Sequence, residues 1–121
     1  MNEQLARLLP RVEKPARYSG GEYNQIIKDK SEIDLRIALC FPDTYEIGMS
    51  NLGMRILYES ANSVDGVWCE RVFAPWGDMD EQMREAGLPL FAIESGDAVR
   101  DFDVIAFSLG YEMAYTAVLN M

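Results

Sequence analysis

Three runs of apolar positions stand out along the chain, at residues 35–41, 67–73 and 104–109. The first is nearly continuous and stops at Pro42, a pattern typical of a strand buried on both faces. The other two runs have the same character, and a shorter one at 90–93 predicts an edge strand. We expect residues 35–41 to form the central strand of a sheet.

The segments between these runs carry helical patterns. One helix is predicted to begin at Ser50 and another at Asp78, which has Glu81 three positions later as in a capping box. Gly87 is expected to end the second helix, and residues 5–9 and 111–120 predict two more helices. The side chains expected to face the sheet are Leu52, Ile56, Leu57 and Ser60 in the first helix, and Met79, Met83 and Ala86 in the second.

Strands that alternate with helices predict an α/β fold with an open parallel sheet of flavodoxin-like type. A five-stranded version of that fold needs two further strand–helix units, so we expect the sheet to be truncated before its last strands. We divide the chain into an N-terminal arm, 1–34, and an incomplete α/β domain, 35–121. The arm is expected to run over the surface of the sheet, and an exposed sheet edge would allow two copies to form a homodimer.

The composition excludes several classes of function. The net charge is −9, which disfavours binding to nucleic acid, and no apolar run approaches the roughly 20 residues that span a bilayer. We therefore expect a cytoplasmic protein that binds neither nucleic acid nor membrane. Histidine is absent, and the two cysteines, Cys40 and Cys69, are too few and too far apart to hold an iron–sulfur cluster. Both cysteines are predicted to be buried in strands.

The loop after the first strand, 42–53, is long and carries two glycines. Gly48 and Gly53 have the spacing of a phosphate-binding loop, but Met54 and Arg55 stand where lysine and a hydroxyl residue are required. The dinucleotide fingerprint is missing as well. Asp43 and Glu46 are better interpreted as caps or turn residues than as an acid–base pair. Extra length at the carboxyl end of a strand is typical of ligand binding.

Residues 43–48, Asp-Thr-Tyr-Glu-Ile-Gly, resemble the Asp-x-His-x-x-Gly signature of cobalamin-binding domains, with Tyr45 in the place of the histidine that ligates cobalt. Residues 103–109 resemble the strand that ends near the nucleotide tail of the corrin. The whole chain resembles the N-terminal region of a family of radical S-adenosylmethionine (SAM) proteins with a cobalamin-binding-like domain. The blocks that carry this resemblance are 14–18, 20–24, 41–43 with 45–53, 70–76 and 102–112.

The resemblance implies a larger parent protein with a catalytic barrel that binds SAM and a 4Fe–4S cluster through a Cys-x-x-x-Cys-x-x-Cys motif. This chain would then be no enzyme by itself, and its partner would be the radical domain of the same parent chain. Because Tyr45 replaces the histidine, any cobalamin would be bound without histidine ligation.

Two hypotheses stay open. In the first, the domain positions cofactor or substrate for the barrel; in the second, it is a scaffold that keeps the fold without a ligand. A small independent enzyme is disfavoured, because no nucleophile–base pair or metal cluster can be assembled from these residues. The candidate contacts to a cofactor are Asp43, Tyr45, Glu46, Gly48, Ser50, Asn51, Ser108, Tyr111 and Glu112.

Overall fold

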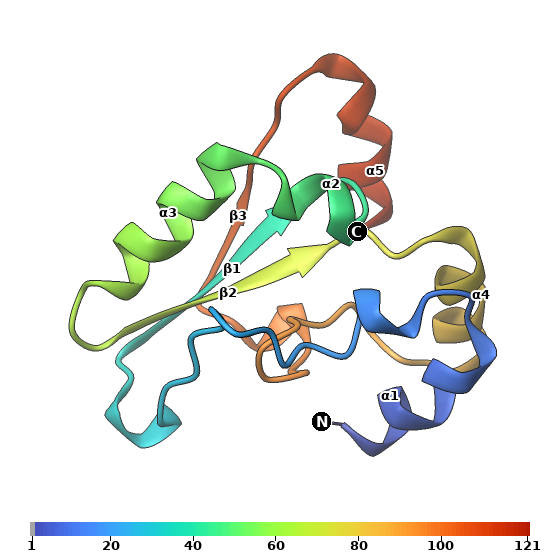
Figure 1. Ribbon diagram of the computed structural model, residues 1–121, viewed down its shortest axis with the longest axis horizontal. Coiled ribbons are helices and arrows are strands. Elements are labelled where there is room, and N and C mark those ends of the chain that lie inside the picture. Colours follow the sequence, from blue (N-terminus) through green and yellow to red (C-terminus); the bar gives the residue numbers. More distant parts are fainter. Residues whose placement is uncertain (1) are drawn as a thin grey trace.

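The computed structural model describes residues 2–121, and its centre is a parallel sheet. β1 (Leu35–Phe41) lies between β2 (Val67–Phe73) and β3 (Val104–Phe107), in the order β2-β1-β3 (Figure 1). The predicted central strand is confirmed, and so is the α/β class with an open parallel sheet. Since all strands run in one direction, their carboxyl ends meet at one edge of the sheet.

Helices connect and flank the strands. The α-helices are α1 (Glu3–Leu8), α2 (Tyr45–Met49), α3 (Leu52–Asn62), α4 (Gly77–Ala86) and α5 (Tyr115–Asn120). Single turns of 3₁₀ helix are η1 (Leu9–Arg11), η2 (Pro15–Arg17), η3 (Lys30–Glu32), η4 (Val99–Asp101) and η5 (Glu112–Ala114). The helix predicted over 111–120 is therefore a 3₁₀ turn followed by a short α-helix.

The predicted buried side of α3 is wrong. The cap is Asn51 rather than Ser50, and its Oδ1 accepts a hydrogen bond from Met54 N at 3.0 Å. The buried residues are Met54, Tyr58 and Asn62. The Asn62 side chain fixes this rotation because it accepts from Cys69 N and donates to Cys69 O, both at 2.9 Å. The side chains predicted to face the sheet are exposed instead: Leu52, Ile56, Leu57 and Ser60.

The capping prediction for α4 is wrong as well, although its buried side is largely confirmed. Trp76 is the cap and makes no side-chain capping bond. Asp78 instead accepts a hydrogen bond from Glu13 N at 2.8 Å, which attaches the N-terminal segment. Met79 and Met83 are buried as predicted, whereas Ala86 is exposed. The predicted end of the helix is confirmed, because Gly87 adopts the left-handed conformation there, with φ 66°.

The N-terminal segment contributes to the core. Side chains of α1 and the following turns pack against α4 in one apolar cluster, formed by Leu5, Leu8, Val12, Tyr18, Met79, Met83, Leu88 and Phe91. Further along, Ile26 N donates a hydrogen bond to the Tyr58 hydroxyl at 2.8 Å, and Ile26 O accepts one from Trp68 Nε1 at 3.0 Å. These two bonds attach the arm to α3 and β2.

Two predicted strands differ from the structure. Residues 90–93 form no strand, and only Phe91 makes an isolated antiparallel bridge, with Ala98. Gly96 turns the chain there with φ 76°, so the segment folds back on itself before a ladder can extend. β3 ends at Phe107 and is not buried: Val104 is 41% and Ile105 48% exposed. Within residues 2–121 no further strand pairs with its outer edge.

Both cysteines are free and buried in strands, as predicted. Burial raises the pKa of the Cys40 thiol to about 12, with a smaller contribution from Cys69. Burial raises the pKa of Cys69 to about 12 as well, and the Glu94 carboxylate adds to the shift. Both side chains therefore act as small apolar groups of the core.

Candidate functional site

A cavity of about 290 Å³ lies where the carboxyl ends of β1 and β3 meet. We call it the edge cavity. Its walls come from the loop that follows β1 and from the segment that follows β3, so two stretches about 60 residues apart in sequence build it together. Four of the predicted cofactor contacts line the edge cavity, namely Asp43, Asn51, Ser108 and Tyr111.

Hydrogen bonds hold three of these four residues in place, Ser108, Asp43 and Asn51. Ser108 N donates to Cys40 O at 3.0 Å and so continues the β1–β3 ladder beyond β3. Asp43 O accepts from Ala74 N at 2.9 Å, and Asp43 Oδ1 accepts from Thr44 N at 2.7 Å. Asn51 caps α3. Asp43 and Asn51 thus have turn and capping roles in the wall of the edge cavity. Tyr111 also lines the edge cavity and is 59% exposed.

The other predicted contacts from the first loop lie apart from the edge cavity. The Tyr45 hydroxyl donates to the Glu22 carboxylate, and its ring meets Phe73 edge-on with centroids 5.5 Å apart. Burial, followed by the Glu22 hydrogen bond, raises the pKa of Tyr45 to about 12. Glu46 is exposed and accepts from Arg17 Nε at 2.8 Å, which lowers the pKa of Glu46. Tyr45 and Glu46 therefore face the N-terminal segment.

Three further predicted contacts do not line the edge cavity: Gly48, Ser50 and Glu112. A Cβ on Gly48 would lie 2.1 Å from Cε1 of Phe73, so only glycine allows α2 to pack this closely on β2. Ser50 Oγ donates to Glu46 O at 2.8 Å. Glu112 is exposed at the start of η5. Glu112 and Ser50 lie in the two segments that flank the edge cavity, whereas Gly48 lines a second cavity.

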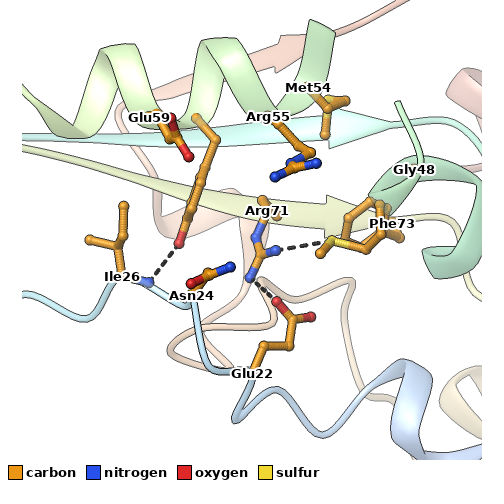
Figure 2. A pocket seen from close by; sticks show the side chains of 11 residues that line it. Glu22, Asn24, Ile26, Gly48, Met54, Arg55, Glu59, Arg71 and Phe73 are labelled. Carbon is orange, nitrogen blue, oxygen red and sulfur yellow. Dashed lines mark hydrogen bonds and ion pairs between the residues drawn. The ribbon is translucent and has the colours of Figure 1, made fainter. Parts of the chain in front are cut away.

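That second cavity, of about 240 Å³, lies between α3, β2 and the N-terminal segment (Figure 2). We call it the α3 cavity. Its central charged residue is Arg71, which is not among the residues predicted from the sequence, and Glu22 of the N-terminal segment lies beside it (Figure 2). Arg71 Nε donates to Glu94 at 2.6 Å, and the Glu94 side chain is fully buried.

A signal for this site exists in the sequence. Residues 67–73, Val-Trp-Cys-Glu-Arg-Val-Phe, place a charged pair inside an otherwise apolar strand, which is uncommon without a compensating partner. Side chains alternate across the sheet, so Glu70 and Arg71 need partners on opposite faces. Glu70 pairs with Arg36 and accepts from Ser95 N at 3.1 Å, and Arg71 pairs with Glu94.

The model of a protein family described as "Radical SAM proteins, N-terminal" matches residues 53–121, which is more than half of the chain. The chain belongs to this family. Comparisons with curated proteins and with solved structures found no match. The matched part of this radical SAM N-terminal domain begins in α3 and includes β2, β3 and the segment after β3. Membership confirms the radical SAM part of the resemblance and implies that the parent protein uses SAM and a 4Fe–4S cluster.

Within residues 2–121 of this radical SAM N-terminal domain, no group of three or more histidine, cysteine, aspartate and glutamate side chains is arranged to hold a metal ion. In the same part of the chain, no helix combines the length and the apolar character needed to cross a membrane.

Proposed function

We propose that this domain holds a cofactor or substrate at the edge cavity and positions it for the radical domain of the parent protein. The observation that carries the proposal is the cavity itself, at the carboxyl ends of two parallel strands, where open α/β sheets bind their ligands. SAM and the iron–sulfur cluster of the parent would supply the radical chemistry. This domain would bind the cofactor or substrate and orient it.

The size of the edge cavity supports a shared site. Its volume, about 290 Å³, lies just below the range of about 300–1,000 Å³ typical of complete small-molecule sites. A ligand as large as a corrin would be covered only in part. The radical domain would have to provide the remaining walls, and we expect this chain alone to bind such a ligand weakly.

The residues present do not fit a cobalamin whose cobalt is ligated by this domain. Tyr45, in the position of the ligating histidine, is bonded to Glu22 and packed on Phe73. The chain has no histidine. A corrin held without axial ligation by the protein, with its periphery against Ser108 and Tyr111, is the form of the cobalamin proposal that remains.

A ligand-free scaffold is the second candidate. The observation that favours it is the exposed apolar surface on β3 and beyond, where Ile105, Leu109 and Met113 are 48%, 49% and 78% exposed. Such a surface is suited to an interface with the radical domain or with a second copy of the chain. We propose a cytoplasmic location, with which the two free, buried cysteines are compatible.

The visible spectrum of the full-length protein separates the cobalamin form of the first candidate from the ligand-free scaffold. The parent protein is purified with hydroxocobalamin and passed through gel filtration, as wild type and as Ser108→Phe, which fills the edge cavity. Ser60→Phe is the matched control, because Ser60 is exposed on α3. The proposal predicts corrin bands in wild type and control, and their loss in Ser108→Phe. If no corrin bands remain in the wild type, the cobalamin form of the proposal is wrong.

A further inference from the structure

The α3 cavity combines apolar walls with two arginine and two glutamate side chains, Arg55, Arg71, Glu22 and Glu59. Met49, Met54, Tyr58 and Phe73 supply apolar surface from α2, α3 and β2. Arg55 and Arg71 line the same cavity from α3 and β2, and in Figure 2 the Arg55 guanidinium extends over the cavity toward that of Arg71. A cavity of this kind is suited to a ligand with an apolar body and an anionic end.

Arg71 retains unused hydrogen-bonding capacity although its side chain is only 7% exposed. Of its five N–H donors, Nε bonds to Glu94, and Nη1 bonds to the Met49 sulfur at 3.0 Å, a weak acceptor. Nη2 lies 2.8 Å from the Glu22 carboxylate, yet none of its N–H bonds points at an acceptor within residues 2–121. A buried donor without an acceptor is costly, and an anion in the cavity would remove that cost.

The acidic groups nearby leave room for such an anion. Glu94 lies fully buried, and burial raises its pKa even though Arg71 acts in the opposite direction. The Glu22 carboxylate is shared between the Tyr45 hydroxyl and Arg71. Arg55 forms no ion pair with any residue in 2–121, Glu59 included. One guanidinium is thus unpaired and the other is incompletely bonded.

We propose that the α3 cavity binds a small organic carboxylate. Its carboxylate lies between Arg55 and Arg71, where the forked geometry of guanidinium groups suits two oxygens. Its apolar body lies against Met54 and Phe73. This site is distinct from the edge cavity, because the two cavities share no lining residue, and it does not depend on the function proposed above.

The test uses three probes with one apolar chain and different ends: hexanoate, 1-hexanol and hexylamine. Saturation-transfer NMR on the full-length protein measures their binding. The proposal predicts saturable binding of hexanoate, and clearly weaker binding of hexanol and hexylamine. Absence of saturable hexanoate binding, or hexylamine binding that is equally tight, would overturn the proposal.

Arg55→Gln is the informative variant, because Arg55 is exposed on α3 and its loss leaves the buried Arg71–Glu94 pair intact. We expect hexanoate to bind at least about tenfold more weakly, as for the loss of one charge-assisted hydrogen bond. Arg84→Gln is the matched control, since it removes the same charge from α4, away from the cavity. If both variants weaken hexanoate binding equally, the effect comes from net charge alone and the proposed site is wrong.

Glu59→Gln tests whether the ligand also carries a positive group. Glu59 lines the same cavity one turn along α3 from Arg55. The proposal predicts unchanged or tighter binding of hexanoate to Glu59→Gln, because a nearby negative charge is removed. Weaker binding in this variant would contradict a site that recognises a simple carboxylate.

Discussion

Gly48→Ala tests the close packing of α2 on β2. A Cβ at this position would lie 2.1 Å from Cε1 and 2.5 Å from Cδ1 of Phe73, and 3.2 Å from Cδ1 of Phe41. Carbon atoms in contact are about 3.5–4.0 Å apart, so the Phe73 ring or α2 must move. Phe73 is 7% exposed and Tyr45 lies against its ring, which leaves the ring little space.

The expected cost follows from two opposing effects. Overpacking of a well-packed core costs about 1–3 kcal/mol, and alanine in place of glycine inside a helix returns up to about 1 kcal/mol. We therefore expect Gly48→Ala to lower the free energy of unfolding by about 1–2 kcal/mol. With a urea dependence of about 1–3 kcal/mol/M, the midpoint should fall by about 0.3–2 M.

Urea unfolding of the 121-residue chain, followed by the fluorescence of the buried Trp68, measures this cost. Gly77→Ala is the matched control, because nothing lies within 4 Å of a Cβ at Gly77, at the start of α4. We expect it to change stability by less than about 0.5 kcal/mol. In a Phe73→Leu background the cost of Gly48→Ala should shrink. Equal stabilities of Gly48→Ala and Gly77→Ala would refute the packing argument.

Two substitutions and one alkylation experiment test the core around β1 and β2. Asn62→Ala removes the side-chain bonds to the backbone of Cys69 and should cost about 2–4 kcal/mol in urea unfolding; a cost below about 0.5 kcal/mol would contradict this role. Cys40 and Cys69, with pKa values raised to about 12, should resist alkylation at pH 8 until urea is added, as read by peptide mass spectrometry. Burial raises the pKa of Glu94 in the folded state, so its contribution to stability is present at low pH and declines as the pH rises above the unfolded value of about 4.3. Glu94→Gln should flatten that decline in a pH series of unfolding curves, and an unchanged slope would argue against the raised pKa.

The strands were the most predictable part of the fold. β1 and β2 occupy the predicted ranges 35–41 and 67–73, because short, mainly apolar segments bounded by turn residues are typical of buried strands. The burial of Met79 and Met83 followed from helical periodicity in the same way. The helix end at Gly87 required only the local preference of glycine for a left-handed cap.

The rotation of α3 was not predictable from apolar periodicity. Apolar residues occur on two sides of this helix, and the side chain that selects between them is the polar Asn62, through its bonds to Cys69. That choice depends on a contact with another element, which single-sequence periodicity does not contain. The exposure of β3 has a similar cause, because an apolar sequence specifies a strand but not what covers it.

The candidate site was predicted in part. Asp43, Asn51, Ser108 and Tyr111 meet at the edge cavity because parallel strands bring their carboxyl ends together. Tyr45 lies elsewhere, since its hydroxyl finds an acceptor in Glu22, 23 positions earlier in the chain. Long-range pairs of this kind cannot be read from one sequence, and the α3 cavity around Arg71 depends on several of them.

The most direct test of the central claim is whether the edge cavity faces the radical domain. A nitroxide is attached at Met113→Cys, beside the edge cavity, or at Ser60→Cys, near the opposite end of α3 (Figure 1). Electron paramagnetic resonance of the full-length protein then compares spin relaxation with the iron–sulfur cluster reduced and oxidised. The account predicts faster relaxation on cluster reduction at position 113 and little change at position 60. Faster relaxation at position 60, with none at 113, would contradict it.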